Sequence, residues 1–62
     1  MTAEDSLARA ESLLERLDAT RAKLEATEDP EQAIELLAEL SELAKEVQAE
    51  IERAKREADA HA

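Results

Sequence analysis

The sequence predicts an all-α protein, a two-helix antiparallel hairpin of the coiled-coil type, and three observations support this fold class. Apolar residues recur with a seven-residue period on both sides of one central break. The break holds the only proline of the chain, and no glycine occurs anywhere. Ala, Glu, Leu, Lys and Arg dominate the composition, as is typical of long helices. We expect residues 1–62 to form a single hairpin, with helices over about 3–27 and 30–60 joined by a hinge at 28–30.

The first predicted helix repeats its apolar residues at two heptad positions, a and d. Position a holds Leu7, Leu14 and Arg21, and position d holds Ala3, Ala10, Leu17 and Leu24. Position e is always acidic and position c is always basic, which predicts one buried seam and a charged outer face. Arg21 interrupts the seam, and we expect its aliphatic stem to pack while its guanidinium reaches water.

The hinge carries the signals of a helix start. Asp29 is a good N-cap and Pro30 suits the first helical turn. Gln32 follows Asp29 by three residues, which resembles a capping box. Without a glycine there is no obvious left-handed cap for the first helix, so we expect a turn of two to four residues.

The second predicted helix continues the same pattern, and the two helices define one seam. In an antiparallel register whose partners sum to about 57, Leu17 faces Leu40 and Leu7 faces Ile51. The expected hairpin seam consists of Leu7, Leu14, Leu17, Leu24, Leu37, Leu40, Val47 and Ile51.

Four aliphatic residues are left beside this seam, and we interpret them as a partner interface: Leu13, Ile34, Leu36 and Leu43. Burying each is worth roughly 1.5–3 kcal/mol, so leaving them in water is unfavourable. A chain of 62 residues also struggles to bury enough surface alone. The expected remedies are self-association into a bundle or docking onto the helices of a larger subunit.

Charge and composition argue against several function classes. The net charge of −9 disfavours direct nucleic acid binding and anionic membranes. No apolar run reaches membrane-spanning length, and the N-terminus does not resemble a secretory signal, so we expect a cytoplasmic protein. No phosphate loop, nucleophile triad or metal-ligand spacing is present, and the lone His61 lies near the C-terminus. We therefore expect no catalytic residues, no cofactor and no metal in this chain.

The hinge end is strongly acidic, because residues 24–44 contain seven acids and no base. Three interpretations remain open. The acids are a solvated face that keeps a helical assembly soluble, a docking surface for a basic partner, or a mimic of DNA.

One stretch is similar to a known family. The Leu43-Ala44-Lys45 step, followed by Ile51 and Ala54, resembles the second helix of the exodeoxyribonuclease VII small subunit. The similarity covers roughly residues 24–56. Where such subunits usually carry an aromatic residue and then a glycine, this chain has Leu37 and Leu40. The resemblance implies a non-catalytic acidic hairpin that assembles on the helical region of a nuclease acting on single-stranded DNA.

Two functional hypotheses follow. The first is a non-catalytic accessory subunit that assembles through a leucine-rich face, with that nuclease as the leading candidate. The second is a stand-alone homo-oligomeric helical bundle with a structural role, of natural or designed origin.

Overall fold

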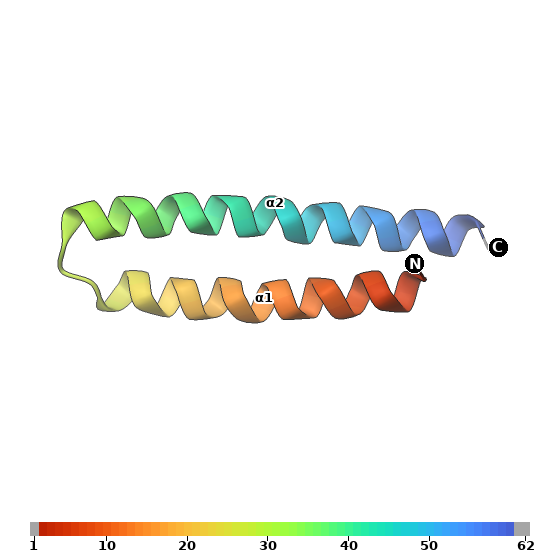
Figure 1. Cartoon of the computed structure of the whole chain (residues 1–62), viewed down its shortest axis with the longest axis horizontal. Helices are drawn as coiled ribbons and strands as arrows, with labels where there is room; N and C mark the ends of the chain where they lie inside the picture. The colour runs from red at the N-terminus through yellow and green to blue at the C-terminus, as the bar shows by residue number, and fades with distance from the viewer. Residues whose placement is uncertain (1, 61–62) are drawn as a thin grey trace.

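A computed structural model describes residues 2–60 and shows two long helices side by side (Figure 1). α1 runs over Ala3–Ala26 and α2 over Pro30–Ala60, and the chain reverses direction between them. The hairpin is 49 Å long and about as thick as it is wide, at 14 × 13 Å between Cα atoms. The all-α hairpin predicted from the heptads is therefore confirmed. His61 lies outside the described residues.

A capping box that the heptads do not reveal starts α1. The Thr2 hydroxyl accepts a hydrogen bond from the backbone N–H of Asp5 (3.2 Å), and the Asp5 carboxylate accepts one from the backbone N–H of Thr2 (3.2 Å). Each side chain satisfies a donor that the helix leaves without a partner. The backbone bond from Thr2, followed by its side-chain bond, lowers the pKa of Asp5 below its ordinary value.

This lowered pKa predicts a pH dependence of the α1 start. The carboxylate stabilises the folded state above the pKa of an unfolded aspartate, and this stabilisation is lost as the pH falls through the lower folded-state pKa. We expect an NMR titration to place the Asp5 midpoint below that of an aspartate in an unstructured peptide. The midpoint should rise in Thr2→Ala, which removes one of the two capping bonds. Equal midpoints in both chains and the peptide would contradict the capping role.

The hinge uses side chains in place of a left-handed residue. Thr27 ends α1 in an extended conformation (φ −78°, ψ 142°), and no residue with positive φ occurs in the described chain. Its hydroxyl accepts from the backbone N–H of Asp29 (3.3 Å) and donates to Gln32 Oε1 (2.6 Å). Asp29 Oδ1 accepts from the backbone N–H of Glu31 (3.0 Å), so Asp29 caps α2 as expected. The predicted capping box is wrong, because Gln32 contacts Thr27 instead.

The observed seam uses heptad positions d and g, whereas the sequence predicted a seam along a and d. Side chains that are buried or half-buried sit at d and g, where g is the position before a. In α1 they are Ala3, Ser6, Ala10, Leu13, Leu17, Thr20 and Leu24; in α2 they are Ala33, Leu36, Leu40, Leu43, Val47, Glu50, Ala54 and Glu57, with Arg53 at c. Four predicted seam residues, all at a, are instead exposed: Leu7, Leu14, Leu37 and Ile51.

Two physical differences favour the d and g seam. A seam along a and d would bury Arg21, whereas the observed seam buries Thr20, whose hydroxyl is satisfied by the Arg16 carbonyl (2.9 Å). The observed seam is also flanked by position c of both helices. That position is basic along α1, and on α2 it carries Glu39 and Glu46, followed by Arg53 toward the open end. Opposite charges therefore flank the seam at Glu39 and Glu46, where an exposed pair contributes a few tenths of a kcal/mol.

The register shifts with the seam. The Arg9–Glu50 ion pair and the Thr27–Gln32 hydrogen bond both join residues whose numbers sum to 59. A sum near 60 aligns every d position of one helix with a g position of the other, such as Leu17 with Leu43. The expected sum of 57 is wrong because it assumed the a and d seam.

Candidate interaction surface

Five large aliphatic side chains remain in water on the hairpin. Their exposed fractions are about half or more, and they are Leu7 (51%), Leu14 (48%), Ile34 (68%), Leu37 (54%) and Ile51 (49%). Four of them occupy position a, and Ile34 occupies the neighbouring position e. We call these five residues the outer aliphatic face.

These residues belong to one side of the hairpin. A two-fold rotation about an axis perpendicular to the plane of the two helices exchanges the two helices of an antiparallel pair. Such a rotation keeps equivalent heptad positions on the same side. Position a flanks the seam next to d on both helices, so Leu7 and Leu14 of α1 share a side with Leu37 and Ile51 of α2. The basic and acidic c positions lie on the opposite side.

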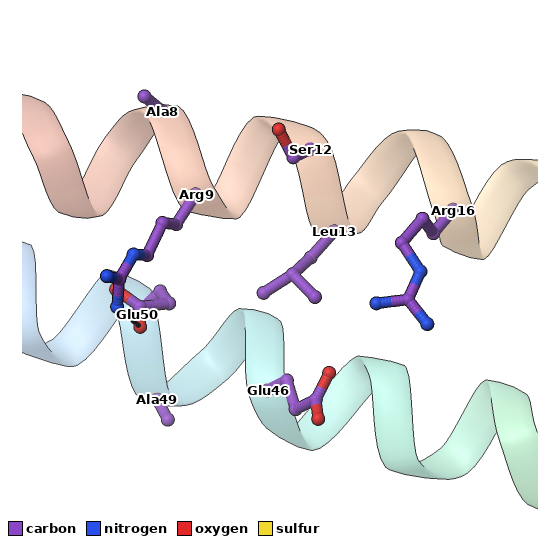
Figure 2. Close-up of a pocket in the computed structure, with 8 residues that line it drawn as sticks. All are labelled: Ala8, Arg9, Ser12, Leu13, Arg16, Glu46, Ala49 and Glu50. Atoms are coloured by element: carbon purple, nitrogen blue, oxygen red, sulfur yellow. Dashed lines mark ion pairs between the residues drawn. The ribbon is translucent and has the colours of Figure 1, made fainter.

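The interface expected from the sequence is largely wrong. Leu36 and Leu43 are buried within the hairpin, with exposed fractions of 7% and 2%. Leu13 is half-buried and points toward α2 (Figure 2). Only Ile34 stays available to a partner. Because g joins d in the seam, these leucines are used internally and the a positions take their place outside.

Acids of α1 border the outer aliphatic face at position e: Glu4, Glu11, Asp18 and Glu25. Two of these acids hold Arg21, whose guanidinium is 2.9 Å from Asp18 Oδ1 and 2.7 Å from Glu25 Oε1. The hydrogen bonds to Asp18 and then to Glu25 raise the pKa of Arg21 above its ordinary value. The Arg21 guanidinium therefore reaches water as predicted, but its stem does not pack in the seam, because position a lies outside it. Its charge is compensated within its own helix.

The opposite side of the hairpin is hollowed into a shallow groove of about 540 Å³ (Figure 2). It is lined by Ala8, Arg9, Ser12, Leu13, Arg16, Glu46, Ala49 and Glu50. The Arg9 side chain reaches across from α1 toward Glu50, with 3.6 Å between Nη1 and Oε1. Arg53 Nη1 approaches the same oxygen at 3.3 Å. This ion pair joins the two helices at their open end.

Glu50 is an unusual seam residue. Its side chain is only 11% exposed, and its second oxygen, Oε2, is buried without a hydrogen-bond partner. The two arginines next to it are much more exposed, at 59% for Arg9 and 42% for Arg53. A buried carboxylate with one unsatisfied oxygen opposes folding unless its ion pairs offset the desolvation.

Among residues 2–60, no group of three or more His, Asp or Glu side chains is placed to hold a metal ion. No helix of that part is long and apolar enough to cross a membrane. No protein-family model, curated protein or solved structure matches this chain.

Two features of the site escaped the sequence reasoning, although signals for both were present. The Thr2-x-x-Asp5 spacing before an apolar repeat is a capping-box signature. The outer aliphatic face could have been found by comparing the two possible seams, since a and g both flank d. The charge of Arg21 at position a favours a seam that uses g in place of a. The acids Glu39 and Glu46, at position c of α2, favour the same choice because position c of α1 is basic.

Proposed function

We propose that this chain is a non-catalytic interaction subunit, a helical hairpin that assembles with a protein partner through its outer aliphatic face. The observation that carries the proposal is the row of five aliphatic side chains that the hairpin leaves about half exposed or more. They gather on one side, where contiguous apolar surface is typical of an interface. Single exposed leucines would need no such explanation.

Energetics support the same conclusion. Fully burying a leucine or isoleucine side chain contributes roughly 1.5–3 kcal/mol. The face therefore offers several kcal/mol of association free energy beyond what the two helices obtain from each other. A hairpin of 62 residues has a small core of its own. Assembly supplies the stabilisation that other small proteins obtain from disulfides or metals.

The resemblance in Leu43-Ala44-Lys45, Ile51 and Ala54 supports one specific setting for this role. In that setting the chain is the small subunit of a single-strand DNA exonuclease and docks on the helices of the catalytic subunit. A cytoplasmic location is part of this proposal. The alternative setting is a stand-alone bundle built from copies of the chain.

Replacing Leu14 and Leu37 by glutamate tests the proposed face. Both side chains are about half exposed in the hairpin, so the double variant should keep its helicity by circular dichroism. Sedimentation equilibrium at micromolar concentrations should show a lower assembly mass, because two charges replace apolar contacts. The matched control is Ala19→Glu with Ala49→Glu, which adds the same charge at exposed f positions away from the outer aliphatic face.

The same variants separate the two settings. Co-expression with the catalytic subunit of exodeoxyribonuclease VII should yield a complex that Leu14→Glu/Leu37→Glu weakens and the control preserves. Equal assembly of the double variant and the parent chain, with every partner tried, would refute the proposed face.

A further inference from the structure

We propose that the outer aliphatic face is covered by a second copy of this chain, with the two hinges at the same end of a four-helix bundle. This inference rests on the proposed function, and it selects the setting in which copies of the chain form a stand-alone bundle. In this arrangement α1 of one copy lies against α2 of its partner, and all neighbouring helices are antiparallel. Three properties of the face support it: its area, its register and its charges.

The area is sufficient for a stable dimer. The hairpin exposes 4707 Å² in total. One of its four long sides amounts to about a quarter of this, on the order of 1,000 Å² per copy, against roughly 800 Å² per partner in a standard interface. Because a two-helix hairpin is one helix thick and two helices wide, stacking two copies face to face gives a square bundle with each helix touching two neighbours.

The register places apolar or flexible side chains next to Leu7 and Leu14. With a two-fold axis along the bundle, two residues from different copies lie at the same height when their numbers sum to about 60, as they do within one hairpin. Leu14 then lies between Ala44 and Gln48 of the second copy, and Leu7 lies between Ile51 and Lys55. Leu14 thus meets a small and a flexible side chain, as interdigitating layers require. Leu7 meets Ile51 and the stem of Lys55, and Leu37 lies level with the Arg21–Glu25 ion pair. Position a and position e of each helix thus form a second seam about a quarter turn from the first.

Charges at position e distinguish this orientation from the reverse one. The e positions of α1 are all acidic, whereas those of α2 contain no acid: Ile34, Ser41, Gln48 and Lys55. With hinges at the same end, Glu4 lies beside Lys55 of the second copy and Glu11 beside Gln48. With hinges at opposite ends, α1 stacks on α1, so that Glu4 opposes Glu25 and Glu11 opposes Asp18. Like charges directly opposite are unfavourable at close range.

The acidic hinge ends oppose the arrangement only weakly. The acids of the first half of α2 lie outside the second seam, with Glu31 at position b on its edge and the others at c and f facing away: Glu35, Glu39 and Glu42. Their mutual repulsion acts through water and is screened over about 8 Å at physiological ionic strength. The e-position contacts lie inside that range.

Cysteine cross-linking tests the arrangement directly, because the chain has no cysteine of its own. Leu14→Cys and Ala44→Cys are made as separate single variants, mixed, equilibrated and oxidised. The mixture excludes cross-links within one hairpin. We expect a disulfide-linked heterodimer in the mixture, while each single variant alone gives only background. Leu14→Cys mixed with the exposed, off-face Ala19→Cys is the matched control and should also stay at background.

The remaining outcomes overturn the inference. Strong self-cross-linking of Leu14→Cys alone would place two copies of α1 together, and hence the hinges at opposite ends. A monomer at all concentrations, without cross-links, would exclude a second copy as the occupant. In both cases the proposed function stands or falls separately, on whether Leu14→Glu/Leu37→Glu weakens assembly with the catalytic subunit.

Discussion

Replacing Leu43 by alanine should remove about half of the folding free energy of this protein. The side chain is 2% exposed and lies in the middle of the seam between α1 and α2. Truncating a buried leucine to alanine costs about 2–5 kcal/mol. A chain of this length has a total stability of roughly 3–9 kcal/mol, at 0.05–0.15 kcal/mol per residue. Chemical denaturation followed by circular dichroism measures the loss.

Leu14→Ala is the matched control, because the same atoms are removed from a leucine that is 48% exposed. In a single hairpin this change should cost much less than Leu43→Ala. Its cost should also shrink on dilution, since Leu14 contributes mainly to assembly, whereas the cost of Leu43→Ala should persist. Equal losses for the two variants at high dilution would contradict the observed seam. It follows that glutamates at Leu36 and Leu43 would destroy the hairpin itself and cannot report on a partner interface.

Replacing Glu50 by methionine should stabilise the hairpin by about 1–2 kcal/mol, since well-packed apolar residues often outperform buried ion pairs. Methionine has a shape similar to that of glutamate. It has no polar atom at the buried position where Glu50 Oε2 now lacks a hydrogen-bond partner. The side chain of Arg9 is 59% exposed and that of Arg53 is 42% exposed, so removing the carboxylate leaves no fully buried cation behind. The midpoint of thermal or denaturant unfolding, at one fixed protein concentration, measures the gain.

Glu46→Met is the control for this gain. It removes the same charge one turn away, from an exposed position in the same groove. We expect its effect to stay within about 0.5 kcal/mol, as is usual for surface substitutions. A destabilised Glu50→Met protein would show that the ion pairs to Arg9 and Arg53 outweigh the desolvation of the carboxylate.

Heptad periodicity was sufficient to predict the fold but not the face that the fold leaves open. Periodicity identifies d as apolar on both helices, and d is indeed part of the seam. It does not decide between a and g, because both flank d and both carry leucines. The sequence reasoning preferred a, which holds Leu7 and Leu14, over g, which holds Ser6 and Thr20. This single step exchanged the internal and external leucines and reversed most of the predicted interface.

The sequence by itself determined two helices, the position of the hinge and its Asp29 cap. These features depend on local backbone chemistry and on an apolar heptad repeat that continues along both helices. Only the tertiary structure decided the rotation of each helix about its axis. That rotation depends on pairwise terms between the helices: Thr20 rather than Arg21 enters the seam, and the basic c positions of α1 lie on the same side as Glu39 and Glu46. Each term is worth only a fraction of a kcal/mol to a few kcal/mol. Together they decide which aliphatic residues remain outside for a partner.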